Sequence, residues 1–455
     1  MAGRKRMPWF CLTTGWRKRT VGEDYTTGGG ACQVRGSTFR QNLRISPECG
    51  IMAAVQATGM EESTMVFEES LLFASGAGSN YRIPSVVADA HGTFYAFCND
   101  RRGTLSDAAP EVFLAFSRKK PGGEWETPRP LVGIPEWACS MGSAVYDRIT
   151  DTVMCCGEKI PVQRREFGHY SADELEKIRE EADRRSKALG IRYGRFLLST
   201  SDGGESFAES PHEIEPREFV HRDGRTVLLG GSCHGSAHGI QLRHGPHAGR
   251  LLCPSRTQAG QYASWDELRA NTYNNALWSD DHGKTWHASS PVQLGTGEGT
   301  LIERADGTIL YNSRAYFRDG LRYLALSRDS GESWGDFRAD GFLREETFCG
   351  CNASFLRIER DELADDSLLP GSADGLTLFV NPRSEKRENM TVCWSFDGGE
   401  SWAGEKTVFP GLCSYSSLDY SKELDRFVLL YECGEEDPCD GGVAAAEFDL
   451  AWLFS

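Results

Sequence analysis

Four copies of one turn motif constrain the fold of this chain more than any other feature of its sequence. An Asp followed two residues later by Gly is a turn signal, because the carboxylate accepts backbone N–H bonds and Gly adopts positive φ readily. Copies at long, uneven spacing indicate a repeated supersecondary unit with variable loops, as in a β-propeller. The pattern Ser-x-Asp-x-Gly-x-Ser/Thr-Trp, in one copy with Thr for the first Ser and Phe for the Trp, occupies residues 200–207, 279–286, 327–334 and 395–402.

The sequence around these turns indicates β-hairpins. Apolar, β-rich runs at 196–198, 323–326 and 391–394 precede three of the copies. A degenerate fifth copy begins at Ser117 and keeps two glycines and Trp125 but has no Asp. We expect each Trp to pack into the core of a blade while the turn lies at the surface, without contact to a ligand.

The charge of the chain argues against nucleic acid as a partner. The total is −16, but residues 1–60 hold nine Lys or Arg against three Asp or Glu, which gives +6 there and −22 in the remainder. An acidic body repels a polyanion. Any anionic substrate must therefore be captured by a local cluster of cations.

The first 60 residues differ from the rest of the sequence. They are basic and have no sustained hydrophobic periodicity, so we expect a disordered extension over 1–60, with Met52 and Met60 as alternative true starts. Their apolar patch, Met7 to Leu12, contains a proline and is too short for the hydrophobic region of a secretory signal. We therefore expect a cytoplasmic protein.

The short length of the apolar runs and the pattern of the cysteines agree with the expectation of a cytoplasmic protein. No stretch reaches the roughly 18 apolar residues of a membrane span, so we expect a soluble protein. The 15 cysteines are odd in number and form no C-x-x-C set. Cys155 and Cys156 are adjacent, and Cys349 and Cys351 could alternate across a strand. We interpret these residues as reduced, mostly buried thiols.

One helix interrupts the β pattern near residues 171–189. Ser171 and Glu174 form a capping box, and Gly190 closes the C-terminal end. One apolar face is formed by Leu175, Ile178, Ala182 and Leu189. We expect this helix to be an insertion between blades, with a solvated outer face, in a domain that spans residues 61–455.

The stretch Tyr81-Arg82-Ile83-Pro84, the turn motifs and a series of polar residues together resemble one known family. From about Ser70 to Glu432 the chain is similar to the exo-sialidases of the six-bladed propeller type, in their bacterial and animal cytosolic forms. The resemblance implies an all-β, six-bladed β-propeller. It also implies an enzyme that hydrolyses terminal α-linked sialic acid from oligosaccharides, glycoproteins or glycolipids with retention of configuration, without a metal or other cofactor.

Sialic acid carries a carboxylate on its anomeric carbon, so its binding favours several guanidinium groups that converge on one anion. Arg82 lies in the family's Arg-Ile-Pro motif, and Arg314 and Arg387 resemble the family's second and third arginines. Arg383 is a rival for the third role. We prefer Arg387, because the family's arginine lies just before the strand that leads into a turn motif.

An anionic substrate would repel a carboxylate nucleophile, and sialidases are the tyrosine-nucleophile exception among retaining glycosidases. Tyr415, between Ser414 and Ser416, resembles the family's nucleophile. A phenol needs a base, and Glu298, 16 residues before Arg314, fits that role. The alternatives for nucleophile and base are Tyr420 and Glu303.

The acid/base is expected to be a carboxyl group on a mobile loop, whose closure would exclude water. Asp107 occupies the family's position after the first hairpin, and Asp100 is its competitor. The acidic residue that the family shows just before the next arginine falls on Asn99 here, which is a departure from the pattern. Arg101 is expected to be an auxiliary contact to the substrate carboxylate or 4-hydroxyl.

Further roles follow from the resemblance. Glu432 resembles the carboxylate that holds Arg82, and Met141 resembles a residue that lines the pocket for the sugar's N-acyl group. His234 and His238 are four residues apart, but no helical pattern surrounds them, so we interpret them as loop residues and not as metal ligands.

Two functions from different classes fit these residues. A sialic-acid-binding propeller without turnover would need only the arginines, so the presence of nucleophile, base and acid candidates favours an enzyme. Within the enzymes, a trans-sialidase or a form that prefers the deaminated sugar would use the same residues with different pocket loops.

Overall fold

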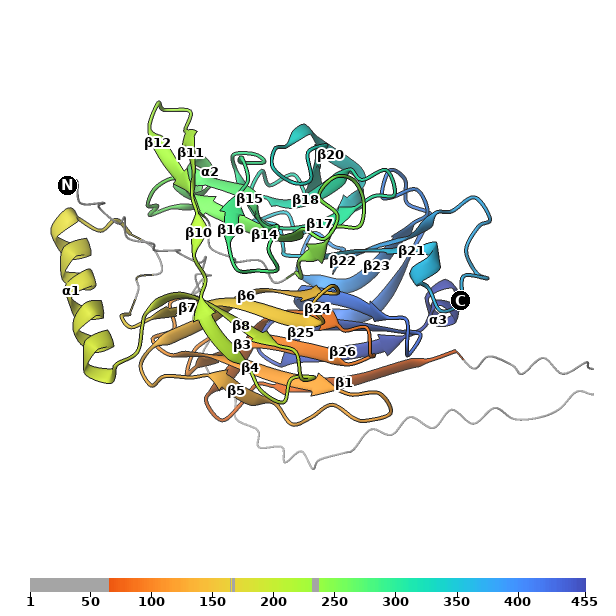
Figure 1. Ribbon diagram of the computed structural model, residues 1–455, viewed down its shortest axis with the longest axis horizontal. Coiled ribbons are helices and arrows are strands. Elements are labelled where there is room, and N and C mark those ends of the chain that lie inside the picture. Colours follow the sequence, from red (N-terminus) through yellow and green to blue (C-terminus); the bar gives the residue numbers. More distant parts are fainter. Residues whose placement is uncertain (1–64, 164, 166–167, 231–236) are drawn as a thin grey trace, which may run out of the picture. The chain divides into compact units, whose positions relative to one another are not determined.

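The computed structural model describes residues 65–163, 165, 168–230 and 237–455. The predicted disordered extension over 1–60, with Met52 and Met60, lies outside the described residues, and so does His234. The described part of the chain consists mainly of short strands, with three α-helices (Figure 1).

The described strands form six antiparallel blades of four strands each, as the all-β propeller prediction requires. The first two blades contain β2 (Ser79–Ala88), β3 (Phe94–Arg102), β4 (Val112–Lys119) and β5 (Arg129–Val132), and β6 (Ala138–Asp147), β7 (Thr152–Ile160), β8 (Gly194–Thr200) and β9 (Ala208–Pro211). The next two contain β13 (Ile240–Gln241), β14 (Leu251–Gln258), β15 (Thr272–Ser279) and β16 (Trp286–Ala288), and β17 (Thr296–Glu303), β18 (Ile309–Ala315), β19 (Leu321–Ser327) and β20 (Gly335–Arg344).

The last two blades share one long strand, β24 (Gly404–Ser421). Its first half pairs with β23 and its second half with β25, with Leu412 at the junction. The fifth blade also contains β21 (Ser354–Glu359), β22 (Gly375–Pro382) and β23 (Glu388–Ser395), and the sixth contains β25 (Arg426–Gly434), β26 (Gly442–Phe448) and β1 (Phe67–Ala74). Because β1 pairs with β26, the two ends of the described domain close the last blade together (Figure 1).

Side-chain hydroxyls join neighbouring blades around the centre. The Ser85 hydroxyl of β2 accepts the N–H of Ala144 in β6 at 3.2 Å, and the Ser417 hydroxyl of β24 accepts the N–H of Val86 at 3.0 Å. Short polar side chains thus satisfy backbone groups of the innermost strands that have no ladder partner. The innermost strands are thereby placed side by side.

The predicted turn motifs have the same place in every blade that carries one. Each complete copy joins the third strand of a blade to the fourth, in blades two to five. In the last copy, Asp397 accepts the N–H of Ser401 at 2.9 Å and the hydroxyl of Ser395 at 2.7 Å, while Gly399 donates to that same Ser395 hydroxyl. The degenerate copy joins β4 to β5, and the sixth blade cannot have a copy because its third and fourth strands, β26 and β1, are not consecutive.

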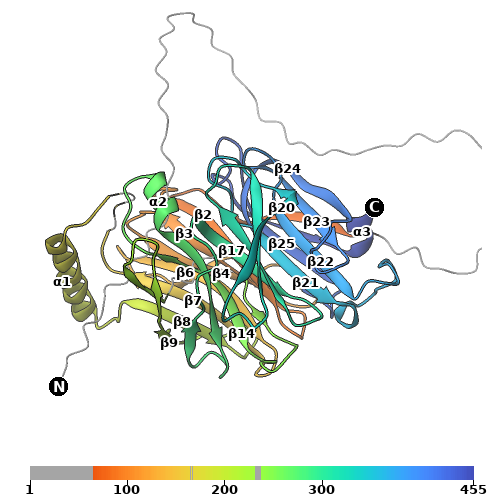
Figure 2. The same ribbon diagram turned by 90° about the horizontal axis from the view of Figure 1, so that it is seen from above.

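Helix α1 (Ala172–Leu189) has the predicted capping box at Ser171, and Gly190 closes it in the left-handed conformation. Two details of the prediction are wrong. The helix lies in the connection from β7 to β8, within the second blade and not between blades, because that connection is long enough to place it outside the sheets (Figures 1 and 2). Ala182 is buried, but Leu189 is 55% exposed, so the predicted apolar face does not extend to the last turn of the helix.

The remaining elements are short. Strand β10 (Ile214–Glu215) pairs in parallel with β16, and β11 (Arg217–Val220) forms a separate hairpin with β12 (Thr226–Leu229). Helix α2 (Trp265–Asn271) lies between β14 and β15, a 3₁₀ turn (Arg360–Glu362) follows β21, and α3 (Leu450–Phe454) follows β26. Within the described residues, no helix is long and apolar enough to cross a lipid bilayer.

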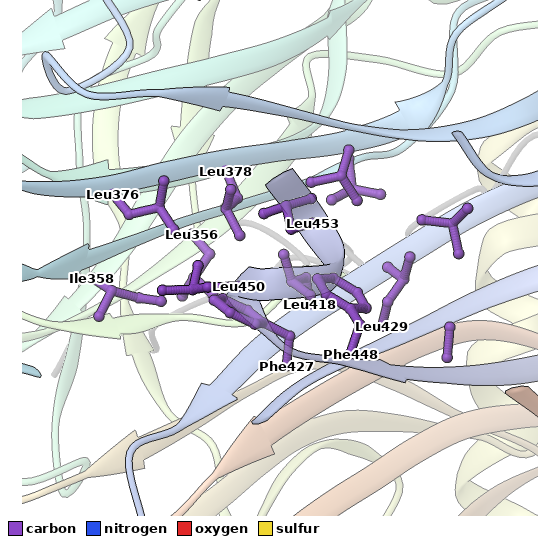
Figure 3. Packing of buried hydrophobic residues seen from close by; sticks show 14 of the residues in the cluster. Leu356, Ile358, Leu376, Leu378, Leu418, Phe427, Leu429, Phe448, Leu450 and Leu453 are labelled. Carbon is purple, nitrogen blue, oxygen red and sulfur yellow. The ribbon is translucent and has the colours of Figure 1, made fainter. Parts of the chain in front are cut away.

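The core consists of several apolar clusters at blade interfaces. Figure 3 shows the one between the fifth and sixth blades, where Leu450 and Leu453 of α3 pack against side chains of β21, β22, β24, β25 and β26. The eleven cysteines of the described residues are all free thiols, and ten of them are buried. Cysteine acts here as a small apolar side chain.

Candidate active site

Four of the innermost strands change register, and each of these changes falls at or beside a predicted site residue. A β-bulge bends a strand and redirects a side chain, and such bulges are common beside active sites. The shifts in β2, β6, β17 and β24 fall at or beside Arg82, Met141, Glu298 and Tyr415. At these positions the side chains therefore do not follow the regular alternation between the two faces of a strand.

Tyr415 lies at the centre of the site. Its hydroxyl donates to Glu298 Oε1 at 2.9 Å and accepts a bond from Arg314 Nη1 at 2.7 Å. The guanidinium carbons of Arg82, Arg314 and Arg387 lie 5.4, 5.8 and 5.6 Å from the centre of its ring. Three arginines from three different blades, far apart in the sequence, thus converge on one phenol.

Glu432 holds Arg82. Its carboxylate accepts from Arg82 Nε at 2.7 Å and Nη2 at 3.1 Å, a forked geometry that fixes the guanidinium plane. The N–H groups of Ile83 and Tyr415 donate to the same carboxylate, at 2.7 and 3.2 Å. Although burial opposes ionisation, Arg82 lowers the pKa of Glu432, so the pair is charged.

The turn between β20 and β21 holds the other two arginines. Cys349 O accepts from Arg314 Nε at 2.8 Å, and Gly350 O accepts from Arg387 Nη2 at 3.1 Å. The Cys349 thiol is 3.3 Å from Arg314 Nη2 and 3.7 Å from Arg387 Nη2. Cys349 and Cys351 therefore do not alternate across a strand: they lie in a turn, because the chain must bend there to place its carbonyl groups against the guanidiniums.

A buried ion pair supports this turn. Glu345 bonds Arg322 Nη1 at 2.6 Å, and both side chains are almost fully buried. The same carboxylate accepts the N–H of Cys351 at 3.2 Å, and Arg322 Nη1 donates to Cys351 O at 2.6 Å. The pair thus determines the path of the turn that contacts Arg314 and Arg387.

Gly350 is expected to be irreplaceable in this turn. Its φ is +66°, and an added Cβ would lie 2.7 Å from the Glu345 carboxylate. We expect Gly350→Ala to lower the free energy of unfolding by about 3 kcal/mol, from left-handed strain and displacement of a buried charge. Urea unfolding of wild type and Gly350→Ala at neutral pH measures this difference.

Gly190 is the matched control, because it has the same φ of +66° but no atom within 4 Å of an added Cβ. Gly190→Ala should therefore show only the strain, about 1 kcal/mol. Equal losses at the two positions would contradict the steric role assigned to Gly350.

Glu298, the candidate base, is a buried carboxylate that carries its charge. Burial alone would raise its pKa, but Arg314, bonded through Nη1, and Arg256, whose Nη1 is 3.7 Å from Oε1, lower the pKa of Glu298 to about 2. Burial raises the pKa of Tyr415 well above its usual value, against the opposing effect of Arg314. The resting pair is thus an anionic carboxylate that accepts a hydrogen bond from a neutral phenol.

Glu298 is expected to make stability depend on pH between about 4.5 and 2. Its pKa is about 2 in the folded state against 4.5 as the ordinary value, so the unfolded state binds more protons in this range and stability falls as pH falls. At about 1.4 kcal/mol per unit, wild type should lose about 3 kcal/mol more than Glu298→Gln across the range. Urea unfolding at several pH values measures this difference.

Glu303, on the same strand, gives a control of opposite sign. Burial raises the pKa of Glu303, so its protonation on acidification stabilises the folded state. Wild type gains this contribution as pH falls from neutral toward about 4.5, so Glu303→Gln should lose more stability than wild type there, above the range in which Glu298 acts. Parallel pH profiles for wild type and Glu298→Gln would contradict the account of Glu298.

Asp107 lies against Arg101. Its Oδ1 is 2.5 Å from Arg101 Nη2, and Arg101 Nη1 donates to Leu105 O at 2.7 Å, so one arginine holds the loop that carries the acid candidate. Although burial opposes the charge of Arg82, the nearby Cys439, Glu432 and Asp107 raise the pKa of Arg82 well above its usual value.

The competing residues lie elsewhere. Asp100 pairs with Arg102 at 2.7 Å, and Arg383 pairs with Glu405 at 2.6 Å on the outer part of the fifth blade. Tyr420 donates to Asp425 at 2.8 Å. Glu303 ends β17, five residues beyond Glu298, and accepts backbone N–H bonds there.

Asn99 and Met141 are linked. The Asn99 amide oxygen accepts the N–H of Met141 at 2.8 Å, so the residue that departs from the family pattern joins the first blade to the second. The Met141 side chain is buried among apolar residues of that interface. His238 is also buried, and within the described residues no three His, Cys, Asp or Glu side chains are grouped so that they could hold a metal ion.

Sequence reasoning missed Arg256 and the turn at Cys349–Cys351 as parts of the site. Arg256 lies in β14 with no motif around it, and the turn contacts the arginines through backbone carbonyls, which any residue could supply. Gly297 and Gly299, on either side of Glu298, are tightly packed: an added Cβ at either would collide with Tyr316 or Tyr311.

Comparison with known proteins agrees with this geometry. Residues 190–423 match the family model of the BNR repeat-like domain. A sialidase of Micromonospora viridifaciens is 38% identical over 385 residues, which cover 82% of this chain and 52% of that protein. The chain belongs to the BNR-repeat family of sialidases.

Two further relatives define how far the family likeness extends. A sialidase of Bacteroides fragilis is 28% identical over 71% of this chain and 54% of its own length, so this sialidase homologue spans about half the length of the two curated relatives. The intramolecular trans-sialidase from Ruminococcus gnavus, solved in complex with oseltamivir carboxylate, superposes with a TM-score of 0.60 at 15% identity, covering 85% of this chain and 98% of that one. That likeness supports the fold.

Proposed function

We propose that this protein is a retaining exo-α-sialidase that releases terminal sialic acid from oligosaccharides, glycoproteins or glycolipids. The observation that carries the proposal is the convergence of Arg82, Arg314 and Arg387 on the ring of Tyr415, whose hydroxyl donates to Glu298. Three guanidiniums suit a carboxylate attached directly to the reacting carbon. A neutral phenol with a buried base suits attack on that anionic sugar.

In the first step, the Tyr415 oxygen attacks the anomeric carbon while the bond to the leaving oxygen breaks. Glu298 accepts the phenol proton, along a hydrogen bond of 2.9 Å that already exists. Arg314 currently bonds both Glu298 and Tyr415. A substrate carboxylate that binds Arg314 would weaken the bond between Arg314 and Glu298. Glu298 would therefore be more basic when the substrate is bound.

Asp107 protonates the leaving oxygen and then, as a base, activates the water that releases the sugar from Tyr415. Arg101 positions Asp107 through the contact at 2.5 Å and is available to the substrate carboxylate or 4-hydroxyl. Glu432 keeps Arg82 oriented toward Tyr415. Met141 is assigned to the N-acyl side of the pocket from the family resemblance alone, since its side chain is buried among apolar residues.

The setting of the enzyme is part of the proposal. No cofactor is required, since nucleophile, base and acid are all side chains of this chain. A reducing compartment such as the cytoplasm fits the eleven free cysteines of the described residues. The acidic body of the protein disfavours nucleic acid as a partner.

Proton NMR of sialyllactose turnover tests the proposal. A retaining sialidase releases the α-anomer of free sialic acid first, and the β-anomer accumulates only by mutarotation. Direct release of the β-anomer would exclude retention, and an anhydro sugar or a new sialoside as product would indicate trans-sialidase chemistry. Binding of free sialic acid without any turnover would indicate a non-catalytic sialic-acid-binding propeller.

A further inference from the structure

The innermost strands end at a second cavity, at the opposite end from the candidate active site. It has a volume of about 430 Å³ and includes Ala88, Glu303 and Glu359, the last residues of β2, β17 and β21. The site residues Arg82 and Glu298 lie in the first halves of β2 and β17. At about 3.3 Å per residue, Glu303 is roughly 17 Å from Glu298 along the strand, so the two sites are separate.

Two carboxylates in this cavity have no cationic side chain at ion-pair distance among the described residues. Asp419 accepts the N–H groups of Ala88 and Tyr420, both at 2.8 Å. Glu303 accepts the N–H groups of Arg243 and His244, at 2.6 and 3.0 Å. Each carboxylate thus keeps hydrogen-bond capacity and a negative charge that backbone donors only partly offset.

The cations around the cavity already have other partners. Arg243 bonds Glu359 at 3.1 Å and also contacts Glu362, and Arg148 bonds Glu362 at 3.2 Å. Lys422 donates to the backbone carbonyl of Asp361 at 2.5 Å. A carbonyl group is neutral, so Lys422 keeps its charge. The residues that line the cavity nevertheless include six carboxylates against four Lys or Arg side chains, so its net charge is negative.

His238 adds an acceptor that independently points to a ligand. Its Nδ1 is 3.0 Å from Gly239 O, so Nδ1 carries a proton and donates to that carbonyl. In the neutral ring, Nε2 then presents a lone pair. The residue lines the cavity and is only 4% exposed, and Nε2 has no hydrogen-bond partner among the described residues.

We propose that this cavity binds a small organic cation with a primary ammonium group. Such a group has a positive charge and N–H donors, which suit the carboxylates of Asp419 and Glu303 and the acceptor of His238 that line this cavity. Tyr146 and Tyr420 also line the cavity and offer aromatic surface to the alkyl part of the ligand. A divalent metal fits less well, since the described residues contain no group of three ligating side chains close enough to coordinate one.

Isothermal titration calorimetry of the full chain tests this site, with 1,4-diaminobutane as the probe. Wild type should bind one equivalent. Asp419→Asn and Glu303→Gln should each weaken binding at least tenfold, because each removes a buried negative charge. Tetramethylammonium at the same ionic strength should not bind, since it has the charge but no N–H donor.

Asp361→Asn is the matched control. This carboxylate also lines the cavity, but its side chain is 82% exposed at the rim, so the change should alter affinity less than twofold. If Asp419→Asn fails to fold, Glu303→Gln decides. No binding of diaminobutane by wild type, equal binding of tetramethylammonium, or unchanged affinity in the Glu303 variant would overturn the proposal.

Discussion

Tyr415→Phe is expected to lower kcat/KM for a sialoside by about 10³-fold or more while leaving the fold intact. The substitution removes only the phenol oxygen proposed as nucleophile, and loss of a nucleophile has effects of this size or larger in other hydrolases. The ring remains among the three guanidiniums, and Arg314 keeps its bond to Glu298. Initial rates with a fluorogenic sialoside and thermal unfolding of the same samples measure both parts.

Tyr420→Phe is the matched control for this change. Tyr420 lies five residues further along β24, and its hydroxyl bonds Asp425 at 2.8 Å and accepts the N–H of Ala364 at 2.9 Å. Its loss should lower stability by about 1 kcal/mol and leave kcat/KM within a few-fold of wild type. A Tyr415→Phe variant as active as the Tyr420→Phe variant would remove Tyr415 from the chemistry.

Arg387→Lys is expected to lower kcat/KM about 100-fold, mainly through KM. A charge-assisted bond is worth about 1.5–3 kcal/mol, and an ammonium cannot reproduce the fork that a guanidinium offers to a carboxylate. The Arg387 side chain is also held by Ser414 at 2.9 Å and by Gly350 O at 3.1 Å, contacts that fix its plane. Steady-state kinetics over a range of sialoside concentrations separates KM from kcat.

Arg383→Lys controls for removal of a guanidinium from the same segment. Arg383 is four residues earlier, pairs with Glu405 at 2.6 Å and stacks on Phe342, away from Tyr415. Its kinetic constants should match those of wild type. If Arg383→Lys lowered kcat/KM about 100-fold and Arg387→Lys left it unchanged, Arg383 would be the third substrate-binding arginine.

The repeated fold could be predicted because its signal is local. Each turn motif contains every group that its own hydrogen bonds need, as the contacts of Asp397 with Ser395 and Ser401 show. The capping box of α1 is equally local. The place of that helix within the second blade could not be predicted, because it depends on which strands pair, and β7 pairs with β8 across the whole insertion.

Motif resemblance predicted the candidate site residues and the convergence of the three arginines, but not the backbone irregularities that position them. Bulges at Arg82, Glu298 and Tyr415 depend on pairing between strands and leave no pattern in one strand alone. The same is true of Arg256, whose role depends on its distance to Glu298. The second cavity is lined by residues from the ends of several innermost strands, so it could not be predicted from any single stretch of sequence.

Covalent trapping tests the central claim most directly: that the arginines hold a sialic acid with its anomeric carbon against the Tyr415 oxygen. The protein would be incubated with 2,3-difluorosialic acid, whose fluorine at C3 slows release of the glycosyl group, then digested and analysed by mass spectrometry. The account predicts one added fluorosialosyl group, on the peptide that contains Tyr415. An adduct on Glu298 or Asp107, or no adduct in a preparation that turns over sialosides, would contradict it.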